Sequence, residues 1–159
     1  MEAILSDLYK NFPGEIYRTL KGYTSTGKNY RTSSTASVYL FVRKNSPSLF
    51  LKINSIEKIF PALELYSEKK ALAWLSGKLN VPQVLCYHKK DTNEYLLTKQ
   101  LPGKSAEHDS FKNDIPYLIQ LLAQSLLQIH QIPAHNCPID ARVETQLQEA
   151  DERLQKGTL

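Results

Sequence analysis

Residues 49–68, LFLKINSIEKIFPALELYSE, contain the two side chains on which the interpretation of the whole chain depends. The first five, LFLKI, are rich in aromatic and aliphatic residues and predict a strand. Because side chains alternate along a strand, Lys52 shares one face with Phe50, while the three aliphatic residues face the other way. A lysine in such a setting either extends its ammonium group to water, which is the common outcome, or meets a carboxylate.

Glu68 is the second of these side chains. The pattern predicts a helix over residues 62–78, and Glu68 falls among the leucines of its apolar stripe. A carboxylate there is costly unless it is paired, although it can also bend out to solvent beside a neighbouring lysine. Each residue explains the other if Lys52 and Glu68, sixteen residues apart, form a strand–helix ion pair. Kinases use such a pair to hold a lysine on the phosphates of a nucleotide.

The rest of the chain divides into a strand-rich part followed by helices. Beyond the elements above, we expect helices near 3–11 and 15–22, a loop over 24–37 with one brief strand around 28–31, strands over 37–43, 84–88 and 95–99, and helices over 115–129 and 142–156. This order predicts an α+β fold. Pro102-Gly103 marks the expected boundary between residues 1–101 and residues 102–159.

Composition narrows the class of protein. The 159 residues are 42% hydrophobic and 23% charged, which is typical of a globular chain. The net charge of +4 comes from scattered lysines, so we expect no nucleic-acid partner. Cys86 and Cys137 are far apart and lack metal spacing, which favours reduced thiols of a cytoplasmic protein over a zinc site. No apolar run reaches the roughly 20 residues of a membrane span, and the N-terminus lacks the positive region of a signal peptide.

Six segments together resemble the aminoglycoside 3′-phosphotransferases, antibiotic kinases built like small protein kinases. They are SSTASVYLF (33–41), LFLKI (49–53), EKKALAWLSGKLNVPQVL (68–85), YLLTKQLPGKSA (95–106), LLAQSLLQIHQI (121–132) and NCPIDARVETQLQEA (136–150). The resemblance implies a kinase-like N-terminal lobe, with an antiparallel sheet and one helix, over residues 1–101. Residues 102–159 would then be a connector and the first helices of an incomplete C-terminal lobe.

The resemblance also implies a nucleotide site. Lys52 would bind the α- and β-phosphates of ATP, and Glu68 would hold it. Phe50 would stack on adenine, unless it is simply a core residue, and Val38 would cover the other side of the base. The remaining implied positions are a gatekeeper, Thr98, a hinge formed by Lys99, Gln100 and Leu101, and a loop over the phosphates formed by Ser34, Thr35, Ala36 and Ser37.

Two features depart from the family pattern. The loop over the phosphates lacks the usual glycine ahead of its serine, and the nearest glycine is Gly27. The catalytic H-G-D loop and the later D-x-G metal ligand are absent from the 159 residues. His108-Asp109 with Asn113 is a superficial match with the wrong spacing, and we expect a solvated loop there.

These departures limit the expected activity. We expect no catalytic or metal-binding residue in this chain and negligible phosphoryl transfer by it alone. Mg²⁺ and an aminoglycoside would bind only with a further C-terminal region. The apolar stripe of the 115–129 helix would be partly exposed. A catalytically dead nucleotide-binding or interaction module, and a related kinase acting on another small alcohol, remain as alternatives.

Overall fold

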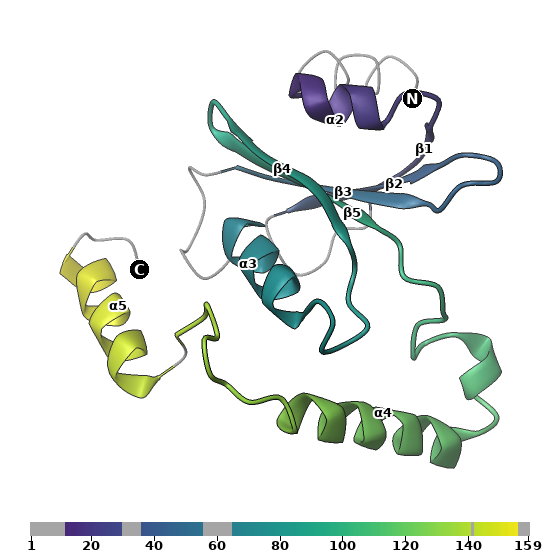
Figure 1. The fold of residues 1–159 in the computed structure, drawn as a ribbon. Coiled ribbons are helices and arrows are strands. Elements are labelled where there is room, and N and C mark those ends of the chain that lie inside the picture. The colour runs from purple at the N-terminus through teal and green to yellow at the C-terminus, as the bar shows by residue number, and fades with distance from the viewer. Residues whose placement is uncertain (1–11, 30–35, 56–64, 141, 156–159) are drawn as a thin grey trace.

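The computed structural model describes residues 12–29, 36–55, 65–140 and 142–155 (Figure 1). Its elements in chain order are α2 (Gly14–Thr19), β1 (Thr24–Asn29), β2 (Ser37–Val42), β3 (Leu49–Ser55), α3 (Leu65–Leu75), β4 (Val84–Lys90), β5 (Asn93–Lys99), the 3-10 turn η3 (Asp109–Phe111), α4 (Ile115–His130) and α5 (Val143–Gln155). The strand-rich first part and the helical second part confirm the α+β class. The expected helix near 3–11 lies outside the described residues.

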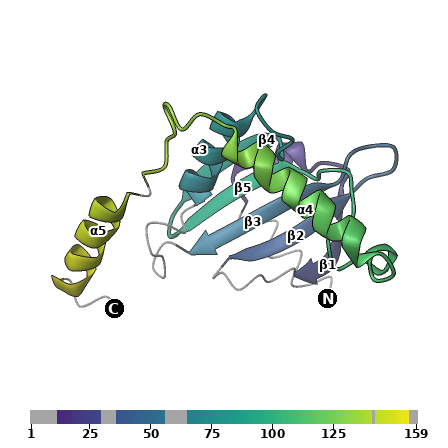
Figure 2. The same cartoon turned by 90° about the horizontal axis from the view of Figure 1, so that it is seen from below.

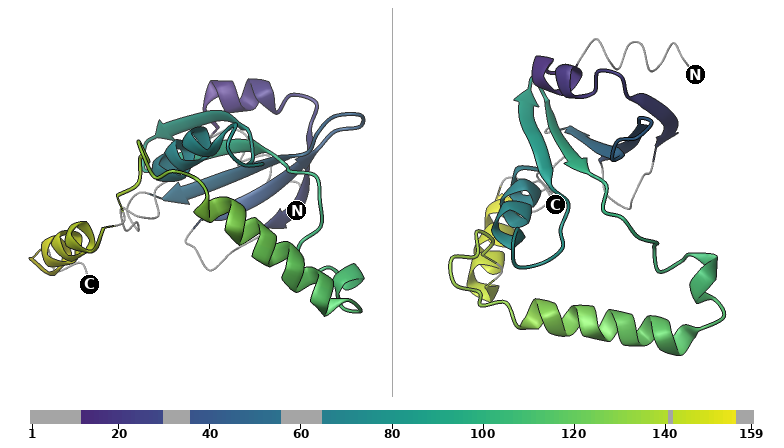
Figure 3. Two further views of the ribbon diagram at one scale, coloured as in Figure 1. Left: turned by 60° about the horizontal axis from the view of Figure 1, so that its bottom comes forward. Right: turned by 45° about the vertical axis from the view of Figure 1, so that its right-hand side comes forward.

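The five strands form one antiparallel sheet in the order β1-β2-β3-β5-β4. Helix α2 covers one face of this sheet, and α3 packs on the other face against β4 and β5 (Figure 1). Helix α4 lies on the same side as α3, and in the view from below it passes in front of the sheet (Figure 2). Both views of Figure 3 show α2 and α4 on opposite sides of the strands. The face that carries α3 is therefore turned toward α4.

The hydrophobic core lies between α2 and the sheet. Ile16 of α2, Phe41 of β2, Leu51 of β3 and Leu97 of β5 are each 0% exposed and belong to one cluster. Full burial of such a side chain stabilises the fold by roughly 1.5–3 kcal/mol. Since β3 contributes to this core from one face, its other face is held rigidly in place.

Strand β3 has the alternation that its sequence predicts. Leu49 and Leu51 are buried toward α2, at 2% and 0% exposure. Phe50 and Lys52 are partly exposed on the opposite face. The expected separation of Lys52 from the apolar side of its strand is confirmed.

The expected loop over residues 24–37 is wrong for residues 24–27, and the brief strand expected around 28–31 begins earlier, at Thr24. Thr24–Asn29 forms the edge strand β1, which pairs with β2 and has a register shift between Ser25 and Asn29. Gly27 has φ +70°, a conformation that suits an irregular edge strand. Ser, Thr and Gly give little strand propensity, but pairing with β2 overrides it.

The helix carrying Glu68 ends earlier than its pattern predicts. Helix α3 ends at Leu75 rather than at residue 78. Gly77 has φ +79°, which is incompatible with helical continuation, and residues 62–64 lie outside the described part. The predicted helix near 15–22 is likewise shorter, at Gly14–Thr19, and the other predicted strands and helices differ only by a few residues at their ends.

Within the described residues, none of the helices has both the length and the hydropathy of a membrane span.

Candidate nucleotide site

Lys52 and Glu68 form the ion pair that the sequence predicts. The Lys52 ammonium on β3 lies 2.6 Å from Oε1 of Glu68 on α3. Their side chains are 32% and 34% exposed. The lysine is therefore fixed by a carboxylate and still reachable by a ligand.

The register of the sheet places further predicted residues beside Lys52. Val38 and Leu96 are directly opposite Lys52 on the two neighbouring strands, and Leu40 and Thr98 are opposite Phe50. Directly opposed residues share a face of the sheet. We call this surface the Lys52 face, and its residues are Val38, Leu40, Phe50, Lys52, Leu96 and Thr98.

Exposure differs along the Lys52 face. Val38, Leu96 and Thr98 are 7%, 0% and 4% exposed, whereas Phe50 stays partly exposed. Val38 and Leu96 therefore form a buried apolar surface beside the accessible ring of Phe50 and the accessible ammonium group of Lys52. Such a combination suits a ligand with a planar base at one end and phosphate groups at the other.

The predicted hinge follows directly from the end of β5. The N–H of Lys99 donates to the carbonyl of Gln83 at 2.9 Å, and the N–H of Gln100 donates to the carbonyl of Ser48 at 2.8 Å. These two bonds tie the hinge to the segments that precede β4 and β3. Leu101 is partly buried, and its successor Pro102 has no N–H.

The predicted phosphate loop is only partly within the described residues. Ser34 and Thr35 lie outside them. Ala36 is 6% exposed, and Ser37 begins β2 at the position opposite Ile53, next to the Val38–Lys52 pair. Because side chains alternate along β2, Ser37 lies with Ile53 on the α2 side of the sheet and not on the Lys52 face, so the structure does not bring its side chain to Lys52. The contribution of Ser34 and Thr35 stays a prediction.

Glu94, which is not among the site residues predicted from the sequence, belongs to this region. Its side chain is 2% exposed. One carboxylate oxygen accepts from the Leu65 N–H at 2.9 Å, and the other accepts from the Tyr87 hydroxyl at 2.5 Å. The alternation of side chains along β5 could have indicated that Glu94 is buried, since it falls on the same face as Leu96 and Thr98. Because Glu94 lies close to the turn at Asp91, it resembles an ordinary polar residue at the end of a strand.

His108 and Asp109 form a surface turn, as expected. The Asp109 side chain is 84% exposed and pairs with Lys112, and the His108 ring accepts from the Ser110 N–H at 3.1 Å. His108 therefore caps η3. In the part of the chain that the structure describes, no three His, Cys, Asp or Glu side chains gather as a metal site would need.

Asp140 accepts several hydrogen bonds at the start of α5. Its carboxylate accepts from the Arg142 N–H and guanidinium and from the Thr145 hydroxyl just before and within α5. These hydrogen bonds hold the pKa of Asp140 well below its usual range. The charge stabilises the start of α5 and lies on a different part of the chain from Lys52.

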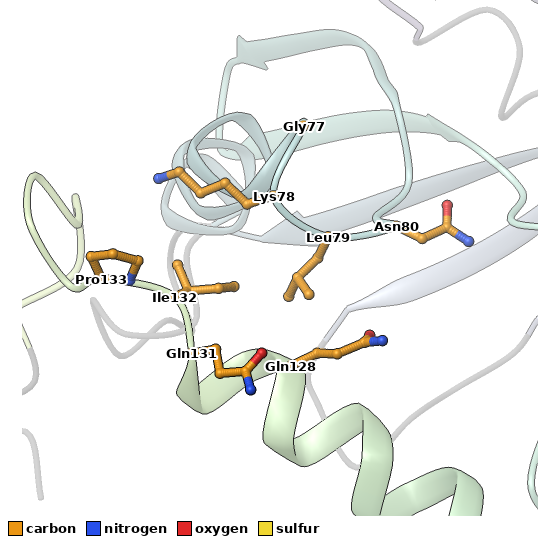
Figure 4. Close-up of a pocket in the computed structure, with 8 residues that line it drawn as sticks. All are labelled: Gly77, Lys78, Leu79, Asn80, Gln128, Gln131, Ile132 and Pro133. Atoms are coloured by element: carbon orange, nitrogen blue, oxygen red, sulfur yellow. The ribbon is translucent and has the colours of Figure 1, made fainter.

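A cavity of about 650 Å³ lies between the loop after α3 and the end of α4. Figure 4 shows Leu79 of the loop facing Gln128 and Ile132 across this space. Lys78, the charged residue of its lining, places its ammonium 3.7 Å from the centre of the Trp74 ring. The cavity includes neither Lys52 nor Glu68, and its chemistry gives no reason to place phosphate groups there.

Comparison with known proteins identifies the family of the chain. A profile of the Phosphotransferase enzyme family matches residues 28–157. An aminoglycoside 3′-phosphotransferase of Niallia circulans is 30% identical over 149 residues, which cover 92% of this chain and 54% of that protein. One from Campylobacter jejuni is 32% identical over 123 residues, covering 77% and 48%. The chain spans about half the length of the curated relatives it matches.

A solved structure gives the same result for the fold. The crystal structure of aminoglycoside-3′-phosphotransferase of type VIII superposes with a TM-score of 0.62 at 20% identity, covering 99% of this chain and 54% of that chain. The five-stranded antiparallel sheet with α3 matches a kinase-like N-terminal lobe, which confirms the expected fold.

Proposed function

Because the chain belongs to the phosphotransferase enzyme family, we propose that it is the ATP-binding portion of an aminoglycoside O-phosphotransferase. The observation that carries this proposal is the 2.6 Å pair between Lys52 and Glu68. Residues 1–101 form the nucleotide-binding lobe, and residues 102–159 begin a helical lobe. The names of the relatives support an aminoglycoside as the acceptor.

The Lys52 face supports a specific orientation of ATP. The α- and β-phosphates meet the Lys52 ammonium, which Glu68 holds in place. The adenine ring packs against Phe50 at the end of the face nearest the hinge. The resemblance implied that Val38 would cover the other side of the base, but Val38 lies on the same face of the sheet as Phe50 and so contacts the ring from the same side. Since the N–H groups of Lys99 and Gln100 are already engaged within the lobe, the Leu101 N–H is the hinge donor for adenine.

Phosphoryl transfer needs groups that these 159 residues do not contain. Neither H-G-D nor D-x-G occurs in the sequence, so the chain supplies neither the acidic residue beside the acceptor hydroxyl nor the ligands for Mg²⁺. We expect the chain to bind nucleotide and to show negligible transfer to an aminoglycoside such as kanamycin. Turnover by the purified chain, removed by Lys52→Ala, would contradict this part of the proposal.

Calorimetric titration with ATP tests the binding proposal. Lys52→Ala is expected to weaken ATP binding at least about tenfold, because it removes the cation that faces the phosphates. Lys44→Ala is the matched control, since Lys44 is an exposed lysine of the β2–β3 turn and its loss changes the net charge equally. The control is expected to keep wild-type affinity.

Two outcomes would overturn the proposal. One is a folded wild-type chain that binds no nucleotide, which favours an interaction module that retains the lobe as a scaffold. The other is equal affinity in the wild type and Lys52→Ala, which places any bound nucleotide elsewhere.

A further inference from the structure

Glu94 is a buried carboxylate in a lobe whose other described charges reach water to a greater extent. It is 2% exposed at the start of β5. A buried charge is costly unless its hydrogen-bonding capacity is used, and here both oxygens accept a hydrogen bond. Geometry of this kind restrains the groups at both ends of each bond.

One of those groups is the first described turn of α3. The Leu65 N–H donates to Glu94 Oε2 at 2.9 Å. N–H groups at the start of a helix lack partners within the helix and carry partial positive charge, so a carboxylate is a favourable acceptor. Glu68 is three residues further along α3 and projects from the same side of the helix. The bond therefore fixes the helix within one turn of the Lys52 partner.

The other group connects α3 to the edge strand β4. The Tyr87 hydroxyl donates to Glu94 Oε1 at 2.5 Å, and the Tyr87 ring lies 5.6 Å from the Tyr66 ring of α3. The Lys69 ammonium lies 5.3 Å from the centre of the Tyr87 ring. Tyr87 thus contacts Glu94 and the first turn of α3 together.

We propose that Glu94 is a positioning residue, which with Tyr87 sets the orientation of α3 and so holds Glu68 against Lys52. Asn54 is opposite Glu94 and Lys52 is opposite Leu96, so Glu94 and Lys52 lie on one face of adjoining strands. A shift of the first turn of α3 moves the Glu68 carboxylate away from the ammonium. The consequence for ATP affinity rests on the proposed function, whereas the geometry of the ion pair does not.

A first experiment measures the ion pair without nucleotide. NMR spectra of the side-chain methylenes next to the lysine ammonium groups are recorded for the wild type, Glu94→Gln and Glu68→Gln. Glu94→Gln is expected to move the Lys52 signal toward its position in Glu68→Gln, because one of the two acceptors is lost and the helix turn is released. Glu15→Gln is the matched control, since Glu15 pairs with His88 and joins α2 to β4.

A second experiment measures ATP affinity in a double-mutant cycle. Glu94→Gln is expected to weaken ATP binding by roughly threefold to tenfold in the wild-type background, as for the loss of one ordinary hydrogen bond. In the Glu68→Gln background the same change is expected to have little further effect, because the residue through which Glu94 acts is already missing.

The outcomes separate the two proposals. An unmoved Lys52 signal in folded Glu94→Gln, or affinity losses that multiply in the double variant, overturns the positioning role. Absence of ATP binding by the wild type overturns the proposed function alone, and the NMR comparison still decides the role of Glu94. If Glu94→Gln does not fold, Tyr87→Phe removes one hydroxyl and takes its place, with the same displacement of the Lys52 signal expected.

Discussion

Lys52 and Glu68 keep about a third of their side-chain surface in contact with solvent. Ion pairs of this exposure contribute only about 0.2–1 kcal/mol to folding, because water and salt screen them. We predict that Glu68→Gln lowers the unfolding free energy by less than about 1 kcal/mol while it weakens ATP binding. Urea unfolding and calorimetry on the same samples check this. A loss of stability of several kcal/mol without a loss of affinity would show that the pair is structural.

Cys86 gives the lobe a sensitivity to alkaline pH. It is 7% exposed, and burial, with a smaller contribution from the negative Glu15, raises the pKa of its thiol to about 11. The folded state therefore keeps the proton longer than the unfolded state does. The resulting stability is fully present below about pH 9, the ordinary thiol value, and is lost as the pH rises through about 11.

The corresponding prediction concerns the slope of stability against pH. Between neutral pH and about pH 11 the thiol should remove about 2–3 kcal/mol of unfolding free energy from the wild type. Cys86→Ala should be less stable at neutral pH because of the lost packing, and should decline less steeply. Burial also raises the pKa of Tyr95. Because Tyr95 is present in both proteins, its contribution to the pH dependence cancels when they are compared. Equal slopes in urea titrations would refute the role of Cys86.

At the level of elements, Gly77 determines where α3 ends. Its φ is +79°, and an added Cβ would meet no atom within 4 Å. Gly77→Ala should therefore destabilise the chain by about 1 kcal/mol through backbone strain alone. Gly14→Ala is the matched control, because Gly14 also has open space around it and begins α2 in a helical conformation. We expect the control to be neutral or slightly stabilising, as shown by the midpoint of urea unfolding.

The interactions that hold α3 in place differ between its two ends. Its first turn is held by Glu94 and Tyr87, whereas its end depends on a glycine that turns the chain. Hydrogen exchange should therefore be slower at the Leu65 N–H than at the last turn of α3. Such a gradient follows from hydrogen bonding and burial at one end of the helix.

On the scale of the whole molecule, α4 carries an exposed apolar stripe. Leu122, Leu126 and Ile129 are 54%, 52% and 51% exposed, which confirms the expectation from the sequence. Exposed apolar patches favour association because water is released when two of them meet. We predict that the 159-residue chain self-associates as its concentration rises, as measured by sedimentation velocity.

A paired substitution tests this prediction. Leu122→Lys with Leu126→Lys should reduce the association. Gln120→Lys with Gln124→Lys adds the same charge on another side of α4 and should reduce it less. Equal effects of the two pairs would mean that net charge, rather than the stripe, controls association.

The sequence alone determined strands β2 to β5, helices α2 to α5 to within a few residues at their ends, and the side of β3 on which Lys52 lies. These features follow from local periodicity: an alternation of two residues in LFLKI and of three to four residues around Glu68 and along α4. It also indicated the family, through segments whose order and spacing are distinctive. The pairing of Lys52 with Glu68 was predictable because each residue was anomalous in its own element.

The tertiary structure alone decided what depends on partners distant in sequence. β1 is a strand because β2 pairs with it, although its Ser, Thr and Gly residues predict a loop. Glu94 looks like a polar strand end until Leu65, 29 residues away, donates to it. Local patterns record the face on which a side chain lies, but the register of the sheet and the placement of α3 fix its distance to a partner.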